Sequence, residues 1–164
     1  MIGLGGVLPT AKPGDVEARI FPKGVHIVTS GCEEGRAGMT AAWVSRVSGT
    51  PPLVAVAMHR ESATRATIQK AGWFVVHALP EEGLHLAHRF GQGSSRDHDK
   101  FAGLDVETSP HGQPILRAAL AYLECRLERR EDVGDHQLVI GEIVGGAILR
   151  AGEPLRYKDA LFPE

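Results

Sequence analysis

Two long stretches of alternating side chains, Ala119–Gly134 and Asp135–Leu149, constrain the fold of this chain most strongly. In the first stretch, even-numbered residues such as Tyr122 and Glu124 fall on one side of an extended chain, and odd-numbered residues such as Leu123 fall on the other. Glycine and aspartate at the junction of the two stretches are typical of a turn. We therefore predict a long strand followed by its hairpin partner.

Four further segments are predicted as strands, because they alternate or are apolar throughout and contain many β-branched residues. They are Gly24–Ser30, Gly38–Ser48, Leu53–His59 and Trp73–Leu79. The sequence "GTPP" separates the second of these segments from the third, since two prolines cannot lie inside a central strand.

Short helices are predicted between the strands. One covers Asp15–Phe21, a second runs from the N-cap residue Ser62 to Gly72, and a third covers Glu81–Phe90. Gly91–Gly103 is a polar loop that is too long for a simple turn, and such loops commonly carry function. Because strands dominate and the helices do not alternate with them regularly, we predict a mainly β fold, an antiparallel barrel with helices on its outside.

Composition narrows the class of protein. The chain has 164 residues and a formal net charge of −2, and it contains no apolar stretch long enough to cross a bilayer. We expect a single domain over residues 1–164 that binds neither nucleic acid nor a membrane. The first 14 residues lack the basic and apolar regions of a signal peptide, and two widely spaced cysteines are typical of a reducing compartment. We therefore expect a cytoplasmic protein.

Two kinds of catalytic site are disfavoured by motif spacing. His85 and His88 lie three residues apart, but no third ligand follows at a recognisable spacing, so a solvated helix face explains them better than a metal site. No G-x-S-x-G sequence occurs, and neither Cys32 nor Cys125 has the surroundings of a catalytic thiol. We expect no metal and no nucleophilic hydrolase.

The junction between a predicted strand and a predicted helix is a candidate anion site. It places Arg60, Ser62, Thr64 and Arg65 where the helix begins. Backbone N–H groups, the positive end of the helix dipole, two hydroxyls and a guanidinium would suit a phosphate. A plain N-cap with surface arginines explains the same residues equally well.

Eight segments in their order resemble the flavin reductase-like family of FMN-binding split barrels: "GVHIVTS", "GMTAAWVSRVSGTPPLVAVAMH", "SATRATI", "GWFVVHAL", "LAHRF", "DKFAG", "ALAYLECRL" and "GDHQLVIGEI". The resemblance extends from about Val25 to Ile143. It implies a split antiparallel β-barrel with short flanking helices, and a homodimer with flavin near the subunit interface. Two positions depart from the pattern, Ala37 where members often carry Asn and Ala42 where many carry Ser or Cys. The missing side-chain donors affect flavin contacts more than the fold.

The resemblance also implies which residues bind the flavin. Main-chain groups of one strand would line the isoalloxazine ring, with small residues allowing close approach and Thr40 supplying a hydroxyl, while the helix start would bind the phosphate. The implied flavin-binding residues are Gly38, Met39, Thr40, Ala41, Ala42, Trp43, Ala57, Met58, His59, Arg60, Ser62, Ala63, Thr64, Arg89, Phe90, Lys100 and Phe101. His136 matches a residue linked to nicotinamide binding.

The activity that the resemblance implies is that of an NAD(P)H-dependent flavin oxidoreductase. It would use FMN, with FAD as the alternative, and NADH or NADPH, and it would supply reduced flavin to a partner monooxygenase. Since the flavin itself carries out hydride transfer, no catalytic side chain is required. Two other functions fit the same resemblance: a flavoredoxin-like electron carrier with tightly bound FMN, and a flavin-binding protein without reductase activity.

Overall fold

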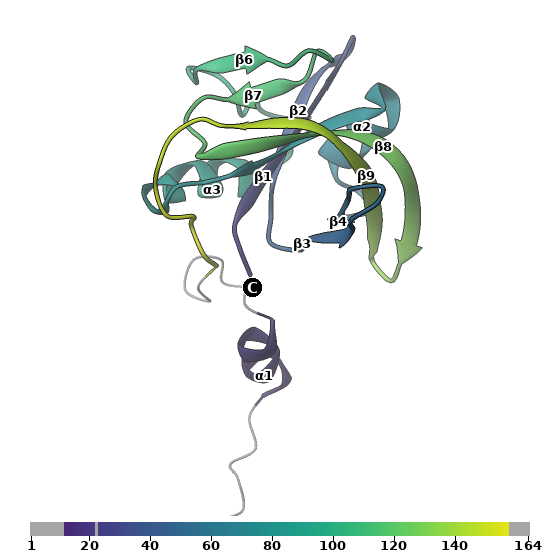
Figure 1. Cartoon of the computed structure of the whole chain (residues 1–164), viewed down its shortest axis with the longest axis vertical. Helices are drawn as coiled ribbons and strands as arrows, with labels where there is room; N and C mark the ends of the chain where they lie inside the picture. Colours follow the sequence, from purple (N-terminus) through teal and green to yellow (C-terminus); the bar gives the residue numbers. More distant parts are fainter. Residues whose placement is uncertain (1–11, 22, 158–164) are drawn as a thin grey trace, which may run out of the picture.

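The computed structural model describes residues 12–21 and 23–157 (Figure 1). The expectation that the first 14 residues are not a signal peptide falls largely on residues outside this part. In the described part of the chain, no helix combines the length and the apolar character that crossing a bilayer requires.

Seven antiparallel strands form one sheet in the order β2-β1-β5-β8-β9-β4-β3. Their bounds are β1 His26–Cys32, β2 Gly35–Ala41, β3 Val44–Ser48, β4 Leu53–His59, β5 Trp73–Ala78, β8 Ala121–Val133 and β9 His136–Ile148. A separate two-stranded sheet holds β6 Val106–Thr108 and β7 Pro114–Leu116. The predicted mainly β, antiparallel architecture is confirmed, including the long hairpin β8–β9.

The sheet must curl, because its two edge strands follow each other directly in the sequence. Only Ala42 and Trp43 connect β2 to β3, so the two edges have to lie close together although they are not paired. In Figure 1 the two long strands of this sheet, β8 and β9, are strongly bent. The prediction of one strand over Gly38–Ser48 was therefore wrong, since the chain leaves one edge at Ala41 and enters the other at Val44.

The helices lie mainly where they were predicted. They are α1 Pro13–Ile20, α2 Ala63–Ala71, the 3₁₀ turn η1 Glu81–Gly83 and α3 Leu84–Gly91. Ser62 caps α2, and Gly72 ends it in the left-handed conformation that favours glycine, as predicted. Helix α1 begins earlier than predicted, at Pro13, and proline is common at the start of a helix because its fixed φ angle suits that position.

Two irregular features were not predicted. Strands β6 and β7 are only three residues long, too short for a periodic pattern. The pairing of β8 with β9 shifts between Glu124 and Cys125, where Val144 of β9 is the extra residue. Both side chains are buried, Glu124 against Ser109 and His111 and Cys125 in the core inside the curled sheet. Cys125 is a buried free thiol, and burial raises its pKa to about 12.

His77 of β5 connects three parts of the fold. It is fully buried, its Nδ1 lies 3.0 Å from the carbonyl oxygen of Ile27 on β1, and the N–H of Leu116 on β7 donates to its Nε2 at 3.1 Å. This pattern requires a neutral imidazole with its proton on Nδ1. Burial lowers the pKa of His77 to about 4.

We expect the protein to lose stability in acid because of His77. Between pH 6.5 and about 4 the unfolded chain takes up a proton that folded His77 does not, so the free energy of unfolding falls by up to about 1.4 kcal/mol per pH unit. Urea unfolding across this window measures the slope. His77→Gln, which offers a donor and an acceptor but does not titrate, should flatten the profile, whereas the exposed control His85→Gln should not. Burial lowers the pKa of His26 as well and acts in the same direction. A His77→Gln profile identical to that of the wild type would contradict the assignment.

Candidate functional site

A cavity of about 370 Å³ lies where the start of α2 faces β2 and the loop after α3. We call it the main cavity. Residues predicted to bind flavin supply much of its wall: Gly38, Met39, Thr40, His59, Ser62, Ala63, Thr64, Phe90 and Lys100. The structure thus brings together nine predicted residues that come from four separate segments of the sequence.

The start of α2 forms one wall of the main cavity. Ser62 Oγ accepts the backbone N–H of Arg65 at 3.3 Å and lies 3.3 Å from Met39 Sδ on β2. Ala63 and Thr64, the first two residues of the helix, line the cavity, and their N–H groups have no acceptor within the helix. This end of a helix carries a partial positive charge and binds anions.

Lys100 places a buried positive charge at the same cavity. The side chain is 6% exposed, and its Nζ donates to the carbonyl oxygen of Phe90 at 2.8 Å. Burial lowers the pKa of this lysine, because desolvation disfavours the ammonium form. An ammonium group has three protons to donate, so an anion in the cavity would find a donor and a partner charge.

The fold itself requires a small residue at position 38. A Cβ at this position would lie 2.5 Å from Cε1 of Phe90 and 3.2 Å from Cζ of Phe101. Both rings are almost fully buried and pack edge to face, with 5.1 Å between their centroids. The missing side chain therefore makes room for Phe90 of α3, and the backbone of Gly38 is left to line the cavity.

The hydroxyl of Thr40 is already engaged. Its Oγ1 donates to the carbonyl oxygen of Ala87 on α3 at 2.6 Å, so this group can only accept a hydrogen bond from a ligand. Two further predicted residues, Ala41 and Met58, place their side chains in the core inside the curled sheet. Phe101 belongs to the second core cluster, between β1 and α3.

The arginines predicted near a phosphate do not line the main cavity. The guanidinium of Arg60 lies 3.8 Å from the carboxylate of Asp132 on β8. Arg65 donates to the carbonyl oxygen of Arg60 at 2.7 Å and to Gln137 on β9. Arg89 donates to the carbonyl oxygens of Lys100 and Ala102 and so holds the loop that carries Lys100. These side chains secure the walls of the site instead of supplying its charge.

An aromatic cluster adjoins the main cavity through His59. The ring of His136 lies 4.9 Å from that of Trp43 and 5.6 Å from that of His59, measured between centroids. Trp43 is 48% exposed, and the carboxylate of Asp135 lies 2.7 Å from Nδ1 of His136. Ala42 and Ala57 line a different cavity beside Trp43, toward α1.

Several lining residues were missed by the sequence reasoning. They come from the turn before α2 and from the predicted polar loop: Glu61, Gly91, Gly93, Ser94, Ser95 and Arg96. The length and polarity of the loop were the only signal, because nothing in the loop sequence indicates which of its side chains turn toward β2.

A family profile described as "Flavin reductase like domain" matches residues 18–163. The chain belongs to the flavin reductase-like family. The match includes every residue of the main cavity, so the site lies entirely within the flavin reductase-like part of the chain.

Named relatives in this family support the same assignment. The chain is 37% identical over 137 residues to the flavin-dependent monooxygenase reductase subunit HsaB of Rhodococcus jostii, covering 84% of this chain and 69% of that protein. It is 34% identical over 142 residues to the FMN reductase (NADH) SmoA of Agrobacterium fabrum, covering 87% and 79%. The NADH:FAD oxidoreductase SgcE6 of Streptomyces globisporus superposes with a TM-score of 0.80 at 26% identity, covering 93% and 94%.

Some relatives in the family are considerably longer than this chain. The chain spans 59%, 69% and 71% of the lengths of three curated relatives and 22% of a fourth.

Proposed function

We propose that this protein is an NAD(P)H-dependent flavin reductase that binds FMN in the main cavity and supplies reduced flavin to a partner monooxygenase. One observation carries the proposal. The start of α2 and the buried ammonium of Lys100 meet at one cavity, which is the donor set that a phosphate needs. The relatives named as reductase components of monooxygenases support the choice of partner.

The residues of the main cavity fit a flavin. In this proposal Ala63, Thr64 and Lys100 hold the phosphate, and the backbone of Gly38–Thr40 borders the ring. A bound flavin supplies hydride acceptance and donation, chemistry that the side chains lack. The protein would orient the ring and leave room for a nicotinamide beside Trp43 and His136. Because the flavin supplies the hydride chemistry, no side chain needs to move a proton.

Anaerobic reduction tests the proposal. Purified protein loaded with FMN should lose its visible flavin band when NADH or NADPH is added, and it should oxidise the pyridine nucleotide continuously when air and free FMN are present. A yellow protein whose flavin neither NADH nor NADPH reduces would contradict the reductase function and favour an electron carrier.

We expect His136→Ala to impair the use of pyridine nucleotide without impairing flavin binding. The imidazole adjoins the main cavity through His59 and packs against Trp43 with the two rings tilted by 52°. Losing a hydrogen bond and an aromatic contact surface should raise the KM for NADH about tenfold. Steady-state kinetics measure this change, FMN titration supplies the flavin affinity, and His85→Ala on the exposed face of α3 is the control. An unchanged KM would remove His136 from the nicotinamide site.

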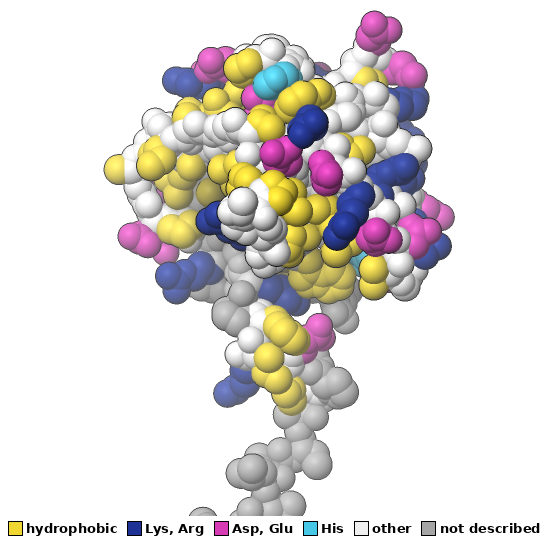
Figure 2. Space-filling view, turned by 45° about the vertical axis from the view of Figure 1, so that its right-hand side comes forward, with side chains coloured by type: hydrophobic (Ala, Val, Ile, Leu, Met, Phe, Trp, Pro, Cys, Tyr) yellow, Lys and Arg dark blue, Asp and Glu magenta, His cyan; other side chains and the backbone are white. Residues whose placement is uncertain are grey.

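We also propose that the curled sheet is the split barrel of this family. In this proposal two copies of the chain form a homodimer. Large apolar side chains support a second copy as partner, since Leu123, Val144 and Ile148 of β8 and β9 are 39%, 43% and 83% exposed. Figure 2 shows hydrophobic side chains gathered on one face of the body and along α1. We propose a single domain over residues 1–164 in the cytoplasm, where NAD(P)H is available and the free thiols of Cys32 and Cys125 stay reduced.

A further inference from the structure

The loop after α3 has two halves that the fold holds in different ways. Residues 93–99, which we call the flap, are exposed or half-buried. Lys100 and Phe101 follow the flap and are buried, with exposed fractions of 6% and 1%. Arg89 of α3 donates to the carbonyl oxygens of Lys100 and Ala102 and so fixes this second half of the loop. The flap therefore lies outside the core, next to a segment that is anchored in it.

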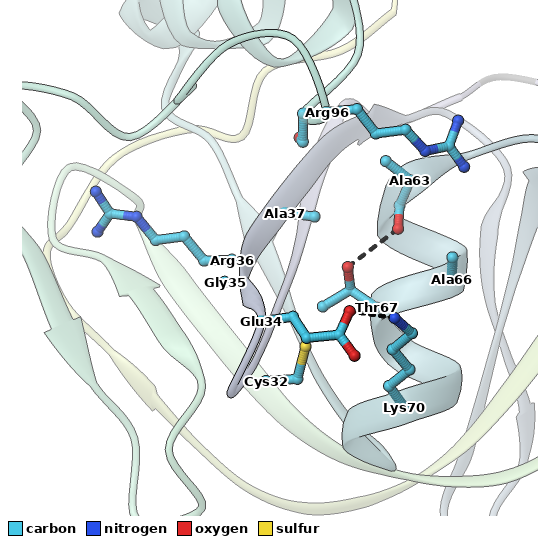
Figure 3. A pocket seen from close by; sticks show the side chains of 11 residues that line it. Cys32, Glu34, Gly35, Arg36, Ala37, Ala63, Ala66, Thr67, Lys70 and Arg96 are labelled. Carbon is cyan, nitrogen blue, oxygen red and sulfur yellow. Dashed lines mark hydrogen bonds and ion pairs between the residues drawn. The ribbon is translucent and has the colours of Figure 1, made fainter.

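The flap forms a wall of two neighbouring cavities. Its residues 93–96 line the main cavity. Ser95 and Arg96 also line a second cavity of about 400 Å³, which we call the side cavity and which extends beside α2 as far as Lys70. Figure 3 shows Arg96 reaching over the start of α2, where both cavities are lined by Ala63. Movement of the flap would therefore uncover the start of α2, where we place the flavin phosphate.

In the part of the chain that the structure describes, two side-chain contacts fasten the flap to β2. The Oγ of Ser95 accepts the backbone N–H of Gly38 and donates to the carbonyl oxygen of the same residue, each at 3.1 Å. The carboxylate of Asp99 lies 3.0 Å from the guanidinium of Arg36, and these side chains are 53% and 41% exposed. An exposed ion pair adds little stability and is screened by salt. The flap is thus held by contacts that water can replace.

The backbone of the flap is suited to moving as a unit. The carbonyl oxygen of Ser94 accepts the N–H groups of Asp97 and His98 at 3.1 and 3.3 Å, so the flap is a compact turn. Gly93, at its beginning, has a φ angle of +62°, in the left-handed region where glycine has the most freedom. A turn that is hinged at Gly93 and anchored at Lys100 can swing away from β2 while Lys100 stays at the main cavity.

We propose that the flap is a gate through which flavin enters and leaves the main cavity, with the ion pair between Arg36 and Asp99 as its latch. The gate opens when this ion pair breaks and the flap turns away from β2. The inference rests on the proposed function and extends it to the exchange of flavin. A reductase that supplies reduced flavin to a partner has to release it, and a latch exposed to water permits that release.

A latch and a flavin contact have different kinetic effects. Both partners of the latch are protein side chains, so weakening it raises the open fraction by the same factor with and without flavin. The association and dissociation rate constants then rise together, and the affinity stays the same. Losing a contact to the flavin would instead raise the dissociation rate constant and weaken the affinity. Measuring both rate constants distinguishes the two roles.

Stopped-flow fluorescence with FMN tests the latch. Asp99→Asn removes the charge but keeps an oxygen for the N–H of Phe101, and it should raise both rate constants about fivefold while Kd stays within about twofold. Arg36→Gln should have the same effect. Glu107→Gln is the matched control, because Glu107 forms an exposed ion pair with Arg117 at the same distance of 3.0 Å and lines neither cavity.

Limited proteolysis of the flavin-free protein gives a readout that does not depend on flavin. Trypsin cleaves after arginine, and the flap carries Arg96. Cleavage within a folded protein requires local opening, so its rate follows the open fraction. Cleavage after Arg96, identified by mass spectrometry, should be about fivefold faster in Asp99→Asn than in the wild type or in Glu107→Gln. Thermal unfolding shows that the variants are equally folded.

Each outcome is decisive. Rate constants that rise together in the latch variants, with faster cleavage after Arg96, support the gate. A dissociation rate constant that rises alone would make Asp99 a flavin contact and overturn the gate. Unchanged rate constants or unchanged cleavage also overturn it, and the proposed reductase then remains intact. A wild type that does not bind FMN overturns the proposed function together with this inference.

Discussion

Lys100→Met should lower the affinity for FMN about hundredfold while the protein stays folded. The ammonium is buried at the main cavity, where it donates to the carbonyl oxygen of Phe90. A phosphate placed at the start of α2 would gain a charge-assisted hydrogen bond from it in a poorly solvated site, and losing such a contact costs about 2–3 kcal/mol. Fluorescence titration of FMN measures the effect, and thermal unfolding shows whether the variant is folded.

The pH dependence of the same interaction provides a second measurement. Burial lowers the pKa of Lys100 below 10.5, so FMN affinity should fall as the pH rises through that lowered value and the ammonium loses its charge. Lys100→Met should lack this alkaline step. Lys70→Met is the matched control, because Lys70 lines the side cavity and not the main one. Equal FMN affinities in the wild type and in Lys100→Met would remove Lys100 from the phosphate site.

Gly38→Ala should destabilise the protein by about 3 kcal/mol, although alanine is the smallest possible addition. The new Cβ would lie 2.5 Å from the ring of Phe90, and that ring is held in turn by Phe101. Neither ring can turn away without disturbing the core cluster between β1 and α3. Urea unfolding measures the loss of stability.

A double-mutant cycle tests the cause of this loss. Phe90→Leu opens space beside residue 38, so Gly38→Ala should cost much less in that background than in the wild type. Gly145→Ala on β9 is the control, because a Cβ there meets no atom within 4 Å and the backbone suits any residue. Equal costs of Gly38→Ala in both backgrounds would show that Phe90 is not the obstacle.

Local sequence patterns predicted the elements well where one physical rule dominates. The continuous apolar run over Leu53–His59 matches β4 residue for residue, because a strand covered on both faces needs little beyond apolar and β-branched residues. Ser62 and Gly72 mark the start and the end of α2, as predicted, because capping residues satisfy backbone groups only a few residues away in the sequence. The prediction over Gly38–Ser48 was wrong because its break at Ala42 and Trp43 reflects the closing of the sheet, which no local pattern encodes.

In the candidate site, too, some features follow from local sequence and others only from the tertiary structure. The sequence by itself determined that a helix with free N–H groups begins just after a strand that ends at His59, since caps and strand periodicity act over short range. Only the tertiary structure decided which charges reach that helix start. Arg60 and Arg65 bind partners on the long hairpin, whereas Arg96 and Lys100 come from a loop, 34 and 38 residues after Ser62. The reason is physical: the direction of a long charged side chain is set by the partners that folding brings within reach, and those partners are remote in sequence.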